Sequence, residues 1–594
     1  MTHPPLGAVP DRSGTRFRVW APDTDRVDLV LEPEGRTVAL DATGDGHFEG
    51  FVADVGAGQR YRFRLDPGSS PGQALGGPLP DPASRFQPEG VHGPSEVVDP
   101  TAYEWQDNEW AGVEQKDLVF YELHVGAFTP EGTFRAAAEK LEYLRDLGVT
   151  AVELMPVADF PGRWNWGYDG AALYAPSRAY GTPDDLRALV DRAHALGLAV
   201  FLDVVYNHLG PDGAYLAAYG PVFTDKHETP WGDAINLDDE GSAGVRGFIL
   251  DNALHWLREY HIDGLRLDAT HALVDDSDTH LLAELTEAVD ALPGPPRTLV
   301  AEDHRNLNTL LLPRPEGLGL DAVWADDFHH LVRNIIAGDT EGYYAAFARA
   351  TSTDLAETLR QGWFYDGRPS RRTGEPRGTS AAPIRPEQCV VCIQNHDQVG
   401  NRPAGDRLTE TTSLAAYRAA SALLLFAPEL PLLFMGQEWA ASTPFQFFTD
   451  HNDELGPLVS EGRKSEFQDF PGFEGEVPDP QDSATFEQST LDWAERDSGD
   501  HARTLALYRA LLALRRELSG EAETLPIGET ALHVQRGAHH LLVAFSPASA
   551  PLPDGAEVVL HTEQPEYAAD PQPLEIGDER VLFHRPGAAV LRTG

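Results

Sequence analysis

The chain has 594 residues and a formal net charge of −48. That length exceeds one ordinary domain and predicts about two to four domains. The strong negative charge argues against nucleic acid and anionic membranes as partners, whereas a neutral substrate is as compatible with it as a cationic one.

The first residues, MTHPPLGAVPDRSG, contain neither a basic segment nor an apolar one, so they do not resemble a secretory signal. No apolar run in the sequence approaches the length needed to cross a bilayer. We therefore expect a cytoplasmic protein without a membrane partner.

Residues 1–105 are predicted to form a β-sandwich. GTRFRVWAPDTDRVDLVLE and YRFRLD alternate apolar and polar residues with the period of a strand, and turn residues separate them. Trp20 fits a core position and a glucan-stacking position equally well. The Pro- and Gly-rich residues 67–93 then indicate an ordered linker that runs over the surface.

Residues 106–522 are predicted to form a (β/α)₈ TIM barrel with loop insertions. Helical patterns at 134–148, 183–197 and 245–262 alternate with apolar runs typical of parallel strands, and Gly148 and Gly197 end the first two helices. The alternation favours a closed barrel over an open sheet. The predicted strands are 118–128, 150–157, 199–208, 264–273, 298–303, 322–327, 390–397 and 431–439.

After a last helical pattern at 502–518, residues 523–594 return to short alternating strands, ALHVQRG, HLLVAFS and EVVLH. They predict a small C-terminal β domain. The predicted fold class is therefore α/β, a TIM barrel between an N-terminal β-sandwich and a C-terminal β domain.

The only cysteines, Cys389 and Cys392, form a C-x-x-C pattern within a predicted strand. Strand positions three apart face opposite sides, which disfavours a redox pair or a metal site. We interpret them as two buried thiols.

Several predicted strands end in polar groups, and in a barrel of this kind such ends converge on the active site. The run VCIQNHDQVG begins apolar and ends in Asn395, His396 and Asp397, which would cost free energy if buried without partners. These three residues either cap the strand or line a site. Other strand ends supply Asp203, Asn207, His208, Arg266, Asp268, His271, Glu302 and Asp303.

Three carboxylates from three strands, together with an arginine and two histidines, suit glycoside cleavage. That chemistry needs a carboxylate nucleophile and a protonated carboxyl as general acid, roughly 5–5.5 Å apart when configuration is retained. Arg266 and Asp268 share one face of a strand, so the arginine would keep the aspartate ionised. A single Asp at a strand end is usually a helix cap, but that explanation is weak for the whole set.

The motifs DVVYNH, GLRLDATH, AED and NHD occur in this order, and the chain resembles the α-amylase superfamily of glycoside hydrolases. The resemblance implies Asp268 as nucleophile, Glu302 as general acid/base and Asp397 as the carboxylate that stabilises the transition state. The stretch WGYDG matches the loop whose tyrosine stacks on the sugar. The substrate-binding residues implied in this way are Tyr168, Asp169, His208, Arg266, His271 and His396, with Asn207 as a structural residue.

Some members of the superfamily bind a metal beside the third-strand motif, through ligands from a long following loop. Here that loop is fairly short, and spacing does not reveal its oxygen ligands. We predict no metal and no cofactor.

The stretches ETPWGDAIN, VWADDFHH, QGWFYDGRPSRRTGEPRG and FQFFTDHNDELG resemble the maltooligosyltrehalose trehalohydrolases, and the resemblance covers nearly the whole chain. It implies hydrolysis of the α-1,4-glucosidic bond next to the terminal trehalose of maltooligosyltrehalose, with retention. The partners would be maltooligosyltrehalose and trehalose, both neutral, and we expect a monomer or weak dimer.

Two alternatives are a glucan branching enzyme, in which a sugar hydroxyl replaces water, and a non-catalytic glucan-binding protein. The complete set of three carboxylates argues against the second alternative.

A catalytic trio shared by a superfamily cannot choose among glucan bonds, so groups that hold the leaving trehalose must provide the selectivity. Each candidate alone could equally hold the loops together. The candidates follow the third, sixth and eighth predicted strands and are Trp231, Asp326, Asp327, His329, Phe448, Asp450 and His451.

Overall fold

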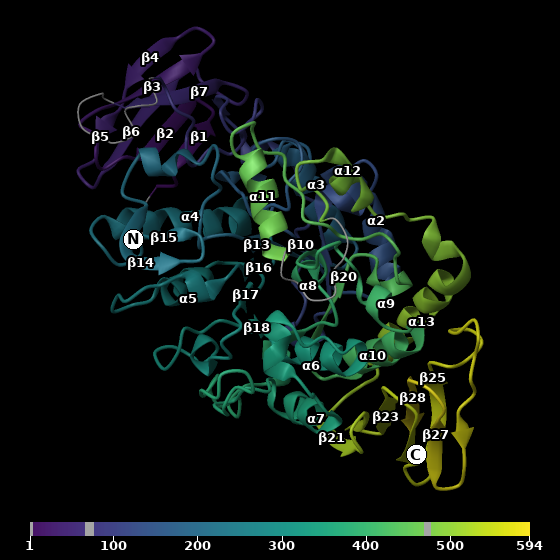
Figure 1. Ribbon diagram of the computed structural model, residues 1–594. Coiled ribbons are helices and arrows are strands. Elements are labelled where there is room, and N and C mark those ends of the chain that lie inside the picture. The colour runs from purple at the N-terminus through teal and green to yellow at the C-terminus, as the bar shows by residue number, and fades with distance from the viewer. Residues whose placement is uncertain (1–3, 66–76, 468–476) are drawn as a thin grey trace.

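A computed structural model describes residues 4–65, 77–467 and 477–594 of the chain. A central parallel barrel lies between an N-terminal β-sandwich and C-terminal β-sheets, which sit at opposite ends of the molecule (Figure 1). The predicted fold class is confirmed, while the boundaries after residues 105 and 522 stay predictions. No helix in the described part of the chain is long and apolar enough to cross a membrane.

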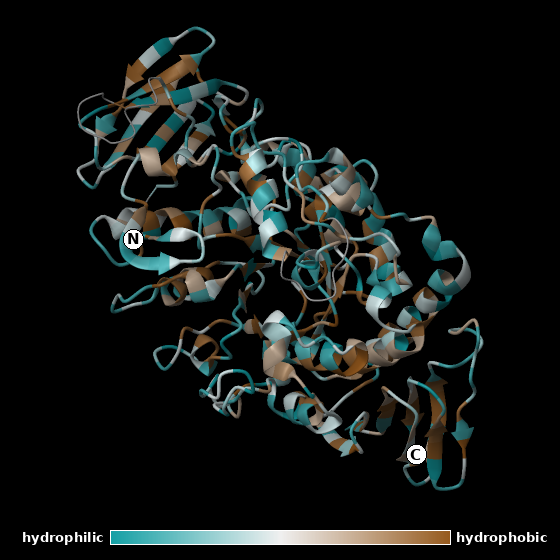
Figure 2. Cartoon of the chain, in the orientation of Figure 1, coloured by the Kyte–Doolittle hydropathy of each residue, from teal (hydrophilic) through white to brown (hydrophobic). Residues whose placement is uncertain are grey.

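The N-terminal part pairs two antiparallel sheets, ordered β1-β2-β6-β5 and β4-β3-β7-β8. Residues on its strands alternate between apolar and polar (Figure 2), and Phe17, Leu29 and Phe63 are fully buried between the sheets. The strands are β1 (Gly7–Asp11), β2 (Gly14–Trp20), β3 (Val27–Glu32), β4 (Arg36–Ala39), β5 (Asp41–Ala42), β6 (His47–Ala53), β7 (Arg60–Leu65) and β8 (Ser95–Glu96).

Trp20 belongs to the contact between the sandwich and the barrel. Its ring is 4 % exposed and lies so close to α4 (Ser242–Glu259) that a Cβ added to Gly244 would come within 2.0 Å of it. A second glycine, Gly220 on a barrel loop, also packs against this ring, because a Cβ there would come within 2.7 Å of it. Trp20 is therefore a packing residue rather than a glucan-stacking one.

The prediction of a surface linker at residues 67–93 is wrong for most of the residues that the structure describes there. Residues 67–76 lie outside the described residues, but Asp81, Ser84 and Arg85 are buried. Arg85 forms an ion pair with Glu259 of α4 at 2.9 Å and donates to the Leu6 carbonyl oxygen at 2.9 Å. Buried charges need such partners, so the segment joins the sandwich to the barrel instead of spanning solvent.

The barrel closes in the order β10-β13-β16-β17-β18-β19-β20-β9, and every neighbouring pair of strands is parallel. Each strand falls within or overlaps a predicted apolar run. The strands are β9 (Phe120–Leu123), β10 (Ala151–Leu154), β13 (Ala199–Val204), β16 (Gly264–Leu267), β17 (Thr298–Glu302), β18 (Ala322–Trp324), β19 (Cys389–Val391) and β20 (Leu430–Phe434).

Local signals set the ends of the surrounding helices. α2 begins after Thr133, whose side chain accepts a hydrogen bond from the Ala136 amide, and it ends at Gly148 in the left-handed conformation. α3 begins with a capping box between Thr182 and Asp185. The other helices of eight or more residues are α4, α5 (Leu281–Asp290), α6 (Asp326–Ala337), α7 (Ser352–Gln361), α10 (Leu414–Phe426), α11 (Gly456–Phe467) and α13 (Gly499–Arg515); α2 spans Phe134–Leu147 and α3 spans Pro183–Ala195.

The barrel interior changes from apolar to charged along the strands. Phe120 and Phe201 pack edge to face at 4.8 Å near the middle of the barrel. Two residues further along the same strands, on the same face, stand Glu122 and Asp203. The buried cysteines are free, and Cys392 belongs to the apolar interior. The carboxyl ends of the strands therefore form a charged layer above an apolar one.

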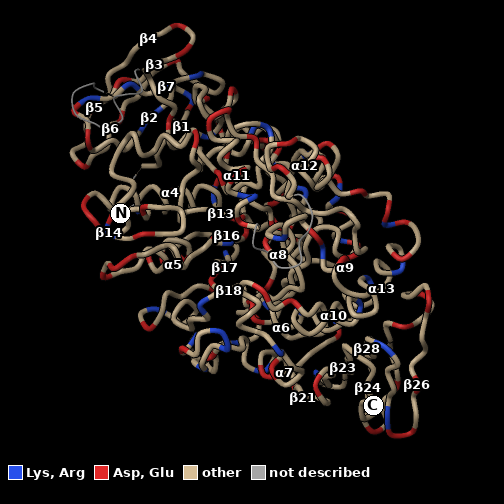
Figure 3. Tube along the Cα trace, viewed as in Figure 1, with Lys and Arg blue, Asp and Glu red and all other residues tan. Residues whose placement is uncertain are grey.

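The C-terminal β region contains a five-stranded sheet, ordered β21-β22-β23-β28-β25, and a three-stranded sheet, ordered β24-β27-β26. Carboxylates are spread over all three parts of the chain, so the negative charge is not confined to one face (Figure 3). The strands are β21 (Ala522–Ile527), β22 (Ala531–Arg536), β23 (His539–Ala544), β24 (Ala548–Pro551), β25 (Glu557–His561), β26 (Glu575–Ile576), β27 (Arg580–Phe583) and β28 (Gly587–Arg592).

Candidate active site

Asp268 follows β16 directly and has both carboxylate oxygens held by buried donors. Arg266 Nη1 donates to its Oδ1 at 2.6 Å, and Asn207 Nδ2 donates to its Oδ2 at 2.7 Å. Arg266 is 0 % exposed and also contacts Asp203 Oδ2 at 2.7 Å. These charge-assisted bonds fix the orientation of the Asp268 carboxylate.

Glu302 ends β17 beside Asp268. Its Oε2 accepts a hydrogen bond from the Ala269 amide at 2.6 Å, and Arg266 Nη2 lies 3.8 Å away. Burial raises the pKa of Glu302 to about 8 although Arg266 opposes the shift, and the Asp268 and Asp397 carboxylates raise it further. A carboxyl in this environment keeps its proton at neutral pH.

Ala269 connects these two carboxyl groups. Its φ of 41° is left-handed, a conformation that is costly for a residue with a side chain. The turn directs the Ala269 amide at Glu302 immediately after Asp268 leaves the strand. The strained residue therefore sits where two reactive groups must be held together.

Asp397 lies on the short helix α8 (His396–Gly400), which follows β19. Its side chain is 38 % exposed, and Oδ1 accepts from Asn401 Nδ2 at 3.1 Å. Asn395 caps α8 by accepting a hydrogen bond from the Gln398 amide. The polar end of VCIQNHDQVG thus serves both purposes, because Asn395 is a cap while His396 and Asp397 face the charged layer.

His396 and Tyr168 join Asp397 to the centre of the barrel. Tyr168 Oη lies 2.7 Å from His396 Nε2 and 2.7 Å from Asp203 Oδ2, and the two rings stack at 5.3 Å. Burial alone would lower the pKa of His396, but the Asp397 and Glu122 carboxylates outweigh it and raise the pKa to about 9.

A second group of predicted residues meets at the rim. Trp231 occupies the turn between β14 (Phe223–Thr229) and β15 (Gly232–Ile235), is 50 % exposed, and stacks on His208 at 4.8 Å. His208 Nε2 lies 2.8 Å from the Tyr168 carbonyl oxygen. Asp169 Oδ2 lies 3.3 Å from His451 Nε2. These contacts connect the loops after β10, β13 and β20.

Three predicted substrate contacts face the protein interior instead. Asp327 Oδ2 accepts from Asn306 and from two backbone amides, His329 is 1 % exposed beside His330 and Tyr344, and Phe448 is 0 % exposed against aromatic rings. Asp327 and His329 lie on α6, which is buried on all sides over residues 327–334, so both are enclosed although they point to different sides of the helix. For these residues the loop-holding explanation fits the geometry.

The remaining candidates are partly exposed. Asp450 accepts from the Arg163 amide at 2.9 Å, so it fastens one loop to another. Burial raises the pKa of Asp326, at the start of α6, to about 7, and Asp327 and Asp397 contribute to that shift. His271 lies on a short 3₁₀ turn after Asp268 and packs edge to face against His304 at 4.5 Å.

Two carboxylates in the charged layer were not singled out from the sequence. Glu122 and Glu153 are each 1 % exposed and are paired in register on β9 and β10. Their only sequence signal is an isolated acidic residue within each apolar run, FYEL and AVEL. Trp324, also inward on β18, lies under the Arg266 guanidinium at 4.4 Å.

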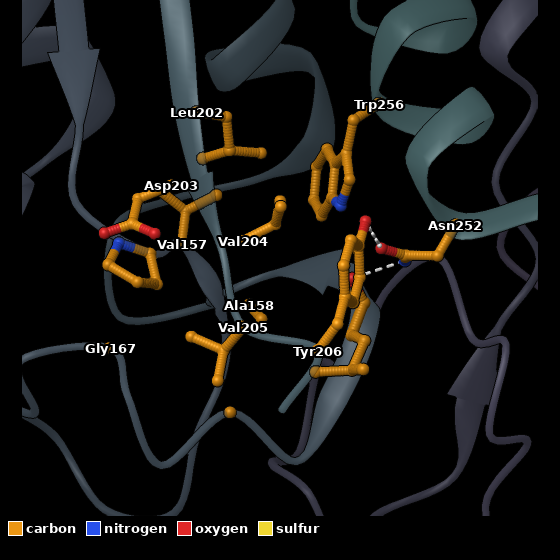
Figure 4. A pocket seen from close by; sticks show the side chains of 13 residues that line it. Val157, Ala158, Gly167, Leu202, Asp203, Val204, Val205, Tyr206, Asn252 and Trp256 are labelled. Atoms are coloured by element: carbon orange, nitrogen blue, oxygen red, sulfur yellow. Dashed lines mark hydrogen bonds between the residues drawn. The ribbon is translucent and has the colours of Figure 1, made fainter. Parts of the chain in front are cut away.

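A cavity of about 20 Å³ lies behind β13 rather than at the reactive groups. Trp256 and Asn252 of α4 line it, and Asn252 accepts a hydrogen bond from Tyr206 at 2.7 Å (Figure 4). Figure 4 shows the Asp203 carboxylate on the other side of the strand. The volume suits roughly one water molecule, so this cavity is too small for a sugar.

One cluster in the described part of the chain has metal-ligating residue types, His227, Asp238 and Asp276. Lys226 Nζ already lies 2.8 Å from Asp238 Oδ2 and supplies a positive charge there. The cluster fixes the base of the hairpin that carries Trp231.

Comparison with known proteins gives one consistent family. Residues 97–225 match the alpha amylase catalytic domain, and residues 5–78 match carbohydrate-binding module 48, the isoamylase N-terminal domain. A malto-oligosyltrehalose trehalohydrolase of Deinococcus radiodurans is 52 % identical, over 86 % of this chain and 83 % of its own length. The enzyme of that name from Rhizobium sp. M-11 is 46 % identical, over 100 % of this chain and 96 % of its own.

Among solved structures, a Salmonella typhimurium chain named as an alpha amylase superposes with a TM-score of 0.89. It is 39 % identical, and the match covers 99 % of each chain. The likeness therefore extends over the sandwich, the barrel and the C-terminal sheets together.

Proposed function

The chain belongs to the malto-oligosyltrehalose trehalohydrolase family, and from this premise we propose how its barrel site performs the reaction. The enzyme hydrolyses the α-1,4-glucosidic bond next to the terminal trehalose of maltooligosyltrehalose. Trehalose and a maltooligosaccharide leave, and the anomeric configuration is retained.

In the first step, an Asp268 carboxylate oxygen attacks the anomeric carbon as the bond to the leaving trehalose breaks. Glu302 gives its proton to the glycosidic oxygen, so trehalose departs neutral. The glycosyl group is then bound to Asp268 as an ester. The observation that carries this assignment is the contrast between the two carboxyls. Arg266 contacts Asp268 at 2.6 Å, whereas Glu302, with a side chain that is 16 % exposed, has a pKa of about 8.

In the second step, Glu302 is ionised and takes a proton from water. The water oxygen attacks the anomeric carbon, and the bond to Asp268 breaks, which restores both carboxyl groups. We assign to Asp397 the stabilisation of the distorted, positively charged sugar in both transition states. Tyr168 would stack on that sugar at the cleavage point.

We place the leaving trehalose at the rim, where Trp231 covers His208 and where Asp169 meets His451. An exposed indole can stack on the apolar face of a sugar, and the polar groups beside it can form hydrogen bonds with the sugar hydroxyls. Neutral oligosaccharides are then the partners that the site requires, and we propose that the chain acts as a monomer or weak dimer.

Product analysis with maltotriosyl-trehalose tests the function. We expect trehalose and maltotriose, with the new reducing end formed first as the α anomer. New α-1,6 linkages would identify a branching enzyme instead.

The residue assignment needs a separate experiment. Asp268→Asn should keep the circular dichroism spectrum of the wild type and lose trehalose release by about 10³-fold or more. Substantial turnover by this folded variant would remove Asp268 from the role of nucleophile.

A further inference from the structure

Glu122 and Glu153 lie below the reactive groups, and the proposed mechanism uses neither. They stand opposite each other on β9 and β10, and each is 1 % exposed. Removing two neighbouring carboxylates from water is costly unless each gains a partner or a proton. Burial and the adjacent Glu122 raise the pKa of Glu153 well above its usual range, so this member of the pair is neutral.

Glu122 contacts one residue twice. Its Oε1 forms a hydrogen bond with His396 Nδ1, and its Oε2 accepts from the His396 backbone amide at 2.9 Å. The carbonyl oxygen of Glu122 accepts from the Met435 amide at 2.9 Å, which fixes the strand itself. Glu122 therefore determines both the position of the His396 backbone and the orientation of its ring.

The other side of the imidazole shows where its protons are. Tyr168 has one hydroxyl proton and lies 2.7 Å from both Asp203 Oδ2 and His396 Nε2. Asp203 Oδ2 also accepts from Arg266, so it is an acceptor and the tyrosine donates to it. His396 Nε2 must then donate to the tyrosine, while Nδ1 faces the Glu122 carboxylate.

The carboxylates of Glu122 and Asp397 favour a charged His396 ring, whereas Arg266 and burial oppose it. Besides Glu122, the carboxyl groups near His396 are Glu153 on β10, Asp203 on β13 and Asp397 on α8. Among the described residues, the Arg266 guanidinium on β16 is a nearby positive charge that opposes a second one. The rings of Trp166 and Trp324 lie 5.7 Å and 6.2 Å from the imidazole.

We propose that Glu122 is a positioning residue of this reaction, which keeps His396 as an imidazolium and thereby holds Tyr168 and Asp397 in place. The inference rests on the proposed roles of Tyr168 and Asp397. His396 Nε2 lies 3.5 Å from Asp397 Oδ1, so the positive ring is the nearest counter-charge for that carboxylate. Glu122 acts at a distance from the sugar, through the histidine alone.

Glu122→Gln tests the proposal, because the amide keeps the size of the side chain but removes its charge. The amide can donate to Nδ1, which favours a neutral ring that still donates from Nε2. We expect kcat to fall roughly 10- to 100-fold, as for other supporting hydrogen-bond partners, with a smaller change in KM.

The pH profile distinguishes this role from general support. The charged ring is fully present below its pKa and is lost as pH rises through it. In the wild type that pKa is about 9, above the value of about 8 for Glu302. Without Glu122 the pKa of His396 falls, so the alkaline limb of kcat/KM moves to lower pH.

Glu153→Gln is the matched control, since it changes an equally buried carboxyl that is already neutral. It should leave the alkaline limb where it is. Circular dichroism and thermal unfolding verify that both variants fold. NMR of histidine-labelled protein, with the His396 signal identified by its loss in His396→Asn, reports the ring charge without any turnover.

The proposal is overturned if the His396 ring of folded Glu122→Gln titrates as in the wild type. It is also overturned if both glutamine variants lose activity equally with unmoved pH profiles. Failure of the proposed function would look different, because the wild type would then form new α-1,6 linkages or release no trehalose from maltotriosyl-trehalose, whatever the charge of His396.

Discussion

At the scale of single residues, one arginine gives two carboxyl groups opposite roles. Arg266 touches Asp268 at 2.6 Å but is 3.8 Å from Glu302. The close guanidinium orients the Asp268 carboxylate, whereas burial raises the pKa of Glu302. A nucleophile and an acid thus arise on neighbouring strands from their different distances to the same cation.

Glu302→Gln should stabilise the protein in a pH-dependent way. The pKa of Glu302 is about 8 in the folded protein, against an ordinary value of 4.5. The folded state therefore retains a proton that the unfolded state releases, and the free energy of unfolding declines as pH rises between these values. The variant has no such proton, so its Tm relative to wild type should be higher at about pH 8 than at about pH 5.

Differential scanning calorimetry of both proteins at the two pH values measures this difference. A Tm difference that does not vary with pH would mean that Glu302 titrates normally. The wild-type kcat/KM should likewise fall as pH rises above about 8, where the acid loses its proton.

Asp397→Asn should lower kcat strongly, by about 10²-fold or more, and change KM less. Its carboxylate is proposed to act on the charge that develops in the transition state, which the ground-state sugar lacks. Steady-state kinetics on maltotriosyl-trehalose separates the two constants. A change in KM alone would make Asp397 a simple binding group.

At the scale of elements, the periodicity of the sequence was sufficient for the barrel strands and the main helices. Caps such as Thr133 and Thr182 are local signals, and the strand-end motifs follow from chain order. Glu122 and Glu153 were missed because their partners come together only when β9 closes against β10 and β20. Local sequence cannot reveal a partner such as His396, which is 274 residues away from Glu122.

Burial was the second quantity that the sequence could not supply. Polar residues after a strand were expected to reach substrate, but Asp327 and His329 are buried because α6 is covered on all sides at this point. Pro and Gly around Asp81 and Arg85 suggested an exposed linker, although this segment is covered by the sandwich and α4. In each case a contact distant in sequence determined whether a polar side chain was exposed.

Substituting alanine for Gly244 and for Gly247, both on α4, should change the free energy of unfolding in opposite directions. A Cβ at Gly244 would come within 2.0 Å of the Trp20 ring, whereas at Gly247 it would meet nothing within 4 Å. Gly244→Ala should therefore lower the free energy of unfolding by about 1–3 kcal/mol through overpacking. Gly247→Ala should raise it by about 0.5–1 kcal/mol, because alanine is the better helix former.

Urea unfolding of both variants measures these changes. Equal effects at the two positions would show that Trp20 does not hold the sandwich tightly against α4.

The position of Trp231 on the hairpin of β14 and β15 predicts that its removal weakens the enzyme's selectivity among glucan bonds. Trp231→Ala removes an exposed ring that stacks on His208, worth about 0.5–1.5 kcal/mol if a sugar uses it. The ratio of kcat/KM for maltotriosyl-trehalose to that for a malto-oligosaccharide of equal length should fall roughly 2- to 12-fold. Phe223→Ala alters another exposed aromatic residue of the hairpin and should leave the ratio unchanged.

At the scale of the whole molecule, the sandwich supports the same loop that leads to this hairpin. Tyr219, between His208 and Trp231, is 1 % exposed in the sandwich core and donates to the Pro80 carbonyl oxygen at 2.8 Å. Gly220 next to it is packed against Trp20. The N-terminal part therefore packs against the loop that leads to the proposed trehalose site. Its described residues make no hydrogen bond to Asp268, Glu302 or Asp397.

Deleting residues 1–105 should consequently affect stability and selectivity more than chemistry. The deletion exposes the α4 surface under Trp20 and leaves Glu259 without Arg85, so we expect a lower Tm and poorer solubility. Any folded remainder should still release trehalose, because the barrel carries the reactive groups, but its preference over plain malto-oligosaccharides should weaken as the loop around Tyr219 loosens. Trp20→Ala in the full chain should reproduce part of that weakening while the enzyme stays folded. A truncated enzyme with undiminished preference would mean that the hairpin holds Trp231 in place without help from the sandwich.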